Sequence, residues 1–214
     1  MIKSGYVHVK DPRDALFDAE VLVKKTYKKT SYWPSTRQPK STARLPYSPG
    51  LAWSFWFDSR AKKLPKAGFY ISPYEFFEAG EVTPGQATIR GGAKLLRKSK
   101  VIRSYYWTTD VDVLVNYLLL YGPVVVGTKW HRGMMTTVPE VGDIEATGEV
   151  VGSNAYLVDG VNLREGTIRL KNSWGADWGR NGWGYLPLND FKALLEDDGE
   201  ACLPVGFGKK WRPT

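Results

Sequence analysis

The spacing of apolar residues changes between the two halves of the chain. In the first half, Trp53, Trp56 and Phe57 recur at the spacing of one helix face within residues 52–64. In the second half, short apolar runs stand between Gly and Asn residues, which is typical of strands joined by turns. The pattern therefore predicts an α+β architecture with two lobes, the first helical and the second rich in strands.

Residues that start or stop regular structure bound the predicted elements. Pro73 follows Ser72 at the first position of a short helix, and Gly122-Pro123 would end a longer one. The predicted helices span residues 52–64, 74–79, 88–100, 110–121 and 189–196. The predicted strands span residues 124–126, 155–158, 167–170 and 184–186. Residues 31–50 are rich in Pro, Ser and Thr, which predicts a long loop or extended arm.

The content of Cys and His limits the chemistry that the chain can carry. Cys202 is the single cysteine, so no disulfide can form within the chain, which fits a reducing compartment. The two histidines, His8 and His131, lack the spacing of a zinc motif, so we expect no metal site and no cofactor.

No apolar run approaches the roughly 20 residues that cross a bilayer, and the first residues lack the apolar core of a signal peptide. We therefore expect no membrane partner, no export by a signal peptide, and a cytoplasmic or virion-associated location.

The charge is unevenly distributed along the chain. Residues 1–107 carry 20 Lys and Arg against 8 Asp and Glu, a balance of +12, whereas residues 108–214 carry 10 against 14, a balance of −4. An uneven charge orients a protein toward an oppositely charged partner, so we expect a protein partner with an acidic surface. Nucleic acid is a weaker expectation, because no known nucleic-acid-binding motif is visible. The alternative is that the basic face only favours solubility.

Residues 169–184, RLKNSWGADWGRNGWG, carry the most specific pattern in the chain. This run resembles K-N-S-W-G-x-x-W-G-x-x-G-[YW], the signature of the papain-like cysteine proteases. Other segments resemble further parts of the same family in the same order. They are GLAWSFWF (50–57), ISPYEFF (71–77), IRGGAKLLRKSKV (89–101), YGPVVVG (121–127) and GSNAYLVDGVN (152–162).

The resemblance implies a papain-like fold with a helical lobe and an antiparallel, barrel-like β lobe. Residues 89–101 resemble a helix found in bacterial and phage members, so we expect a member of that kind. The expected divisions are an N-terminal extended arm or crossover (1–44), a helical lobe (45–111), a β-rich lobe (112–208) and a basic tail (209–214).

Papain-like catalysis needs a thiolate at a helix start, an imidazole that moves protons, an Asn that orients the imidazole and a Gln that binds the oxyanion. The resemblance places these roles on Ala52, Asn154, Asn172 and Pro46, so only the Asn matches. The methyl group of Ala52 is no nucleophile, the amide of Asn154 has no basic nitrogen near neutral pH, and Pro46 lacks an N–H. From these positions we predict that no catalytic residue remains and that the chain is not an enzyme.

Two other side chains could act as nucleophiles. Ser48 precedes the predicted central helix, but no base is evident for it. The resemblance places Cys202 in the closing strand, where we expect a buried, inert thiol. Asn172 could instead hydrogen-bond to Asn154 in a purely structural pair.

Four side chains are expected near the ancestral substrate groove. These candidate groove-lining residues are Trp53, Trp130, His131 and Trp174. For the tryptophans, the alternative is that they only pack the interface between the lobes. For His131, the alternative is a surface or packed structural histidine.

We first predict a pseudoprotease that acts as a structural or binding protein, for example a head, neck, tail or decoration component of a phage particle. Its basic half would contact an acidic neighbouring subunit. A module that binds peptides in the groove is the first alternative. A hydrolase with residual, non-standard activity is the second.

Overall fold

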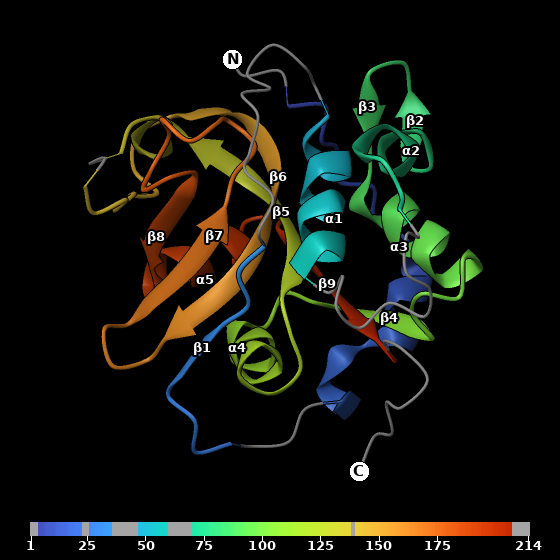
Figure 1. Cartoon of the computed structure of the whole chain (residues 1–214), viewed down its shortest axis with the longest axis horizontal. Coiled ribbons are helices and arrows are strands. Elements are labelled where there is room, and N and C mark those ends of the chain that lie inside the picture. The colour runs from blue at the N-terminus through green and yellow to red at the C-terminus, as the bar shows by residue number, and fades with distance from the viewer. Residues whose placement is uncertain (1–3, 23–25, 36–46, 60–69, 138–139, 207–214) are drawn as a thin grey trace.

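The computed structural model describes residues 4–22, 26–35, 47–59, 70–137 and 140–206 (Figure 1). The helices are η1 (Pro12–Phe17), η2 (Ala19–Leu22), α1 (Ser48–Ser59), α2 (Pro73–Glu78), α3 (Ile89–Lys98), α4 (Val111–Leu120), η4 (Arg132–Met135) and α5 (Leu188–Glu196), where η denotes a 3-10 helix. The strands are β1 (Thr30–Tyr32), β2 (Glu81–Thr83), β3 (Gln86–Ala87), β4 (Ser104–Thr108), β5 (Val124–His131), β6 (Val150–Asn162), β7 (Thr167–Lys171), β8 (Trp183–Pro187) and β9 (Glu200–Val205). The predicted α+β architecture is confirmed.

Helix α1 begins earlier than the sequence pattern predicted, at Ser48 rather than at residue 52. The predicted strands are present but longer, and β6 extends over Val150–Asn162 because residues on both sides of the predicted core continue the hydrogen-bonded ladder with β5 and β7. None of the described helices is long and apolar enough to cross a membrane.

One antiparallel sheet joins most of the described strands. Its order is β4-β9-β5-β6-β7-β8, with β1 pairing along β6. Strands β2 and β3 form a separate hairpin beside α2 and α3, on the opposite side of α1 from strands β6 to β8 (Figure 1). We call α2, α3 and the β2-β3 hairpin the helical group. Helix α1 lies between the sheet and the helical group, where it can present residues to both.

The sheet separates two hydrophobic cores. Along β5, Val124 and Val126 enter the core shared with α4 and α5, whereas Val125 enters the core around α1 and α3. Along β6, Tyr156 and Val158 face the first core, and Leu157 faces the second. Because successive side chains of a strand point to opposite faces, the same strands form a wall of both cores.

Close packing holds α1 against α3. The Trp53 side chain is fully buried, and its indole N–H donates a hydrogen bond to the carbonyl oxygen of Ile89 at 2.7 Å. A Cβ atom at Gly92 would lie only 2.2 Å from Trp53 Cδ1, so a glycine is required where the indole crosses α3. This contact helps to orient α1 so that its first turn faces β6.

Candidate functional site

The first turn of α1 lies against β6. The Ala155 N–H donates a hydrogen bond to Ser48 Oγ at 3.1 Å, which ties the start of the helix to the strand. Ala52 is one helical turn after Ser48, so both residues lie on the same side of α1. Ala52 is 1% exposed. The methyl group is therefore packed between helix and strand.

Two asparagines face each other beside this helix start. Asn154 Nδ2 donates a hydrogen bond to Asn172 Oδ1 at 3.2 Å, and the Ser173 N–H donates to the same oxygen at 2.7 Å. The hydrogen bond that the sequence suggested between the two amides is thus present. We call Ser48, Ala52, Asn154 and Asn172 the interlobe site.

The amide pair leaves one donor and one acceptor open. Because the Ser173 N–H requires an oxygen on Asn172, and that oxygen accepts from Asn154, the orientation of both amides follows from the network. Asn154 Oδ1 and Asn172 Nδ2 are buried and have no hydrogen-bond partner among the residues that the structure describes. Leaving a buried polar group unpaired costs about 1–3 kcal/mol, so the pair is ready to bind another polar group.

The remaining predicted catalytic position cannot be placed. Pro46 lies outside the described residues. Asn154 and Asn172 are both 0% exposed. Within the described part of the chain, the interlobe site therefore contains an amide pair, a hydroxyl and a methyl group, all of them neutral.

An extended stretch near the start of the chain covers the edge of this site. We call Ser4–His8 the N-terminal segment. The Ser48 N–H donates to the carbonyl oxygen of Ser4 at 2.9 Å, and the hydroxyl of Ser4 donates to the carbonyl oxygen of Ser153. Ser153 is the neighbour of Asn154, so this segment lies directly beside the amide pair.

The N-terminal segment also joins the helical group. Tyr6 forms a parallel bridge with Ala87 of β3. The Ala87 N–H donates to the carbonyl oxygen of Gly5 at 2.7 Å, and the Val7 N–H donates to that of Ala87 at 3.1 Å. The segment is therefore held beside β3 by backbone hydrogen bonds, and beside β6 by the hydroxyl groups of Ser4 and Ser153.

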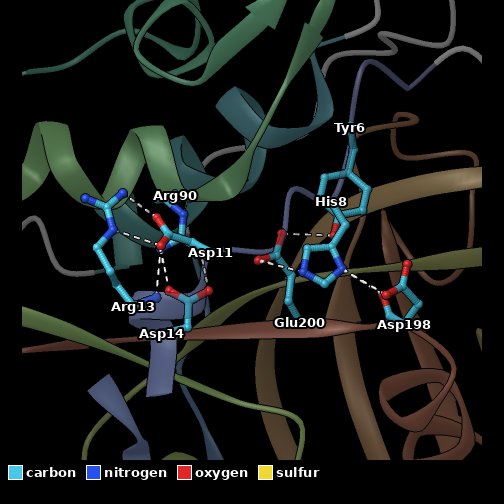
Figure 2. Close-up of polar contacts among 8 residues, drawn as sticks. All are labelled: Tyr6, His8, Asp11, Arg13, Asp14, Arg90, Asp198 and Glu200. Carbon is cyan, nitrogen blue, oxygen red and sulfur yellow. Dashed lines mark hydrogen bonds and ion pairs between the residues drawn. The ribbon is translucent and has the colours of Figure 1, made fainter. Parts of the chain in front are cut away.

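The Tyr6 side chain reaches into the sheet (Figure 2). Its hydroxyl donates a hydrogen bond to Glu200 Oε1 at 3.0 Å, and its ring lies where a Cβ at Gly127 would come within 2.2 Å of Tyr6 Cζ. Burial raises the pKa of the Glu200 carboxyl to about 8, and the bond from Tyr6 partly opposes that rise. Burial and the nearby Glu200 raise the pKa of Tyr6 well above its ordinary value.

His8 completes this contact at the surface of β9. Its Nδ1 lies 3.1 Å from the carbonyl oxygen of Asp198, and its Nε2 lies 3.8 Å from Glu200 Oε2. Figure 2 shows the imidazole between the two acidic residues. The N-terminal segment therefore ends in a polar contact with the same carboxyl that Tyr6 binds.

The four residues expected to line a groove occupy different places. Trp53 and Trp130 are both 0% exposed and lie inside the two hydrophobic cores rather than on an open wall. Trp174 is partly buried and packs on Trp130, with ring centroids 5.4 Å apart. His131 ends β5, and its Nδ1 lies 2.9 Å from the carbonyl oxygen of Gly148. The structure does not bring this set to one surface.

Sequence reasoning missed the N-terminal segment. Ser-Gly-Tyr-Val-His carries no motif, and its partners outside the segment are distant in sequence, with Ser48 of α1 the nearest and Glu200 of β9 among the farthest. The only available signal was Gly127, a residue without a side chain within an apolar strand, which marks a close approach by another part of the chain.

The structure is similar to solved structures of cysteine proteases. Xylellain, a cysteine protease from Xylella fastidiosa, aligns with a TM-score of 0.74 and 17% identity over 95% of this chain and 97% of xylellain. Digestive procathepsin L 3 from the larval midgut of Tenebrio molitor aligns with a TM-score of 0.65 and 14% identity, over 88% of this chain and 75% of the procathepsin chain. The Carica candamarcensis cysteine protease CMS1MS2, in complex with E-64, aligns with a TM-score of 0.64 and 11% identity, over 84% of this chain and 99% of the protease. No protein-family model and no curated protein sequence matches the chain.

The prediction that this chain is not an enzyme is wrong. Each of these neighbours is a cysteine protease, so the comparison gives no support for the absence of an enzymatic activity. The prediction relied on three substituted positions, and Pro46 lies outside the described residues. Loss of the expected side chains does not by itself exclude catalysis by other groups.

At these identities the similarity establishes the architecture, and it agrees with the order of motifs along the chain. A helical group and an antiparallel sheet meet at α1, with the KNSW run leading out of β7 beside the interlobe site. The chain has the fold of the papain-like cysteine proteases.

Proposed function

We propose that this chain binds an extended polypeptide segment at the interlobe site, in the position that its own N-terminal segment occupies. The observation that carries the proposal is the set of backbone hydrogen bonds around Ser4–Val7. Ser48 donates to Ser4, Ala87 donates to Gly5, and Val7 donates to Ala87. Addition of an extended peptide to an existing strand is a general mode of peptide recognition, in which main-chain bonds supply affinity.

The Tyr6 side chain suggests which peptides bind. Its ring fills the space above Gly127, and its hydroxyl reaches the buried carboxyl of Glu200. A segment with an aromatic side chain that ends in a hydrogen-bond donor fits this position. Specificity would come from this side chain, since backbone bonds alone do not distinguish sequences.

The experiment uses a labelled peptide, Ser-Gly-Tyr-Val-His, added to the full chain and followed by fluorescence anisotropy. In the wild-type protein the resident segment competes as an intramolecular ligand at high effective concentration. Tyr6→Ala weakens that competitor, so we expect the peptide to bind this variant at least tenfold more tightly than the wild type. A second peptide with Ala in place of Tyr should bind the variant more weakly.

Tyr74→Ala is the matched control, because Tyr74 is 54% exposed on α2, and this variant should bind as the wild type does. Equal affinity of the peptide for the two variants would refute the proposal. Mass spectrometry of the recovered peptide adds the enzymatic question to the same experiment. Cleaved peptide would identify turnover at the binding site, and intact peptide would identify binding alone.

A structural role in an assembly such as a phage particle makes a different prediction. A building block would contact its neighbours through outer surfaces, so neither Tyr6→Ala nor the peptide would alter its assembly. Co-purification of ordered copies within a particle, unaffected by the peptide, would favour that role over peptide binding.

A further inference from the structure

A second cavity lies away from the interlobe site, between η1 and α3. Its volume is about 490 Å³. It is lined by five cationic side chains, two carboxylates and two aromatic rings. These are Arg13, Arg90, Lys94, Arg97 and Lys98, then Asp11 and Asp14, then Phe17 and Tyr105. We call it the basic cavity, because its lining carries a balance of +3.

Two of the arginines are already fixed by the carboxylates (Figure 2). Both Nη atoms of Arg90 donate to the two oxygens of Asp14, and Arg13 Nε donates to Asp11 Oδ1 at 2.8 Å. Hydrogen bonds from Arg13 hold the pKa of Asp11 well below its ordinary value, so this carboxylate stays ionised. These two ion pairs give the cavity an ordered wall.

The other three cations have no such partner. Lys94, Arg97 and Lys98 are exposed on α3, and among the described residues no carboxylate lies within ion-pair distance of them. Their spacing of three and four residues places them on one helix face, where like charges repel. A ligand with negative charge would remove this repulsion, and the guanidinium of Arg97 can bind two oxygens of one oxyanion.

The surroundings give the cavity a preference for anions. On the other side of η1 lies a cavity of about 290 Å³ with five acidic side chains in its lining. These are Asp14, Asp18, Glu20, Asp110 and Glu200. An anion that approaches this surface is repelled by Asp18, Glu20 and Asp110 on one side of η1 and attracted on the other.

We propose that the basic cavity binds a small polyanion, a ligand with two or more phosphate or carboxylate groups. Cavities of roughly 300–1,000 Å³ hold small molecules, so the size fits a compact ligand better than a nucleic acid or a protein surface. The stacked rings of Phe17 and Tyr105, with centroids 6.0 Å apart, form an apolar part of the wall. This proposal is independent of the proposed peptide binding.

Isothermal titration of the full chain with inorganic tripolyphosphate at 50 mM salt tests the proposal. We expect saturable binding that weakens at least tenfold at 200 mM salt, because exposed charges are screened. The double variant Lys94→Gln/Arg97→Gln should bind at least tenfold more weakly than the wild type. The double variant Arg164→Gln/Lys192→Gln removes two exposed cations from the strand-rich lobe and should bind within twofold of the wild type.

Citrate at the same concentrations separates the two ligand types, since it carries carboxylates only. Binding of either probe that is lost in the α3 variant supports a polyanion site. No binding of either probe at 50 mM salt would overturn the proposal, and so would equal affinity in the two double variants. If the α3 double variant fails to fold, the single variants Lys94→Gln and Lys98→Gln replace it, since both side chains are exposed.

Discussion

Tyr6 donates a hydrogen bond to the buried carboxyl of Glu200 at 3.0 Å, although 194 positions separate the two residues along the chain. The bond joins the N-terminal segment to β9, and the backbone of the same segment reaches β3 and α1. One tyrosine thus connects the helical group to the sheet at the proposed binding site. This connection makes Tyr6 and Glu200 the first residues to test.

Removal of the Tyr6 hydroxyl should destabilise the protein. Tyr6→Phe keeps the ring above Gly127 but leaves the Glu200 carboxyl without its donor. Loss of one partner of a buried hydrogen bond costs about 1–3 kcal/mol, so the free energy of unfolding should fall by that amount. Urea unfolding measures the change. Tyr74→Phe, at an exposed position of α2, is the control and should change the free energy by less than about 0.5 kcal/mol.

Glu200 should make stability depend on pH. Its pKa is about 8 in the folded protein and 4.5 in its unperturbed state. Between these values the folded state holds a proton that the unfolded state releases, so the free energy of unfolding falls as pH rises from about 4.5 to about 8. The slope reaches at most roughly 1.4 kcal/mol per pH unit.

Glu200→Gln removes the titrating group but keeps an oxygen that can accept from Tyr6. We expect the variant to match the wild type near pH 4.5 and to exceed it in stability increasingly up to about pH 8. Urea unfolding of both proteins across this range tests the expectation. Parallel stability curves would show that Glu200 does not titrate as its burial implies.

The amide pair gives a third prediction. Asn172→Ala leaves the Ser173 N–H and Asn154 Nδ2 without their shared acceptor. Loss of an acceptor shared by two buried donors costs roughly 2–6 kcal/mol, so the urea midpoint should fall clearly. Asn116→Ala is the control, because the Asn116 amide bonds to Asp112 on the exposed side of α4. Equal losses in the two variants would argue against a closed network at Asn172.

A fourth prediction concerns the contact between α1 and α3. Alanine normally favours a helix over glycine by about 1 kcal/mol, yet Gly92→Ala should destabilise the protein. The new methyl group would lie 2.2 Å from Trp53 Cδ1, and overpacking of a core costs about 1–3 kcal/mol. Thermal unfolding of Gly92→Ala beside Lys94→Ala, an exposed site on the same helix, separates the clash from helix propensity. A more stable Gly92→Ala would show that the indole can move aside.

Much of this fold could be predicted from the sequence, because local signals agreed with it. Proline and aromatic spacing located α1 and α2, and the KNSW run identified the papain-like fold with its turn after β7. Cys202 is fully buried in β9, as expected for a closing strand. The pairing of Asn154 with Asn172 also followed from the resemblance, which places the two residues on neighbouring catalytic positions.

The contacts of the N-terminal segment could not be predicted in this way. They consist of backbone hydrogen bonds and one tyrosine whose partners are distant in sequence, and backbone bonds leave no pattern in side chains. The burial of Trp130 was likewise not indicated by any motif, whereas the helical spacing of Trp53, Trp56 and Phe57 did predict a packed face. An aromatic residue beside a motif fits a core as well as a groove, and only three-dimensional packing distinguishes the two.

The shared wall of β5 and β6 limits how a ligand can reach the interlobe site. Separating the two cores would expose apolar side chains such as Val125 and Leu157 to water, which is unfavourable. A hinge-like opening of the lobes is therefore costly. The N-terminal segment can leave without breaking this wall, because few of its side chains belong to either core. The rate at which that segment detaches would therefore set an upper limit on the rate of ligand exchange.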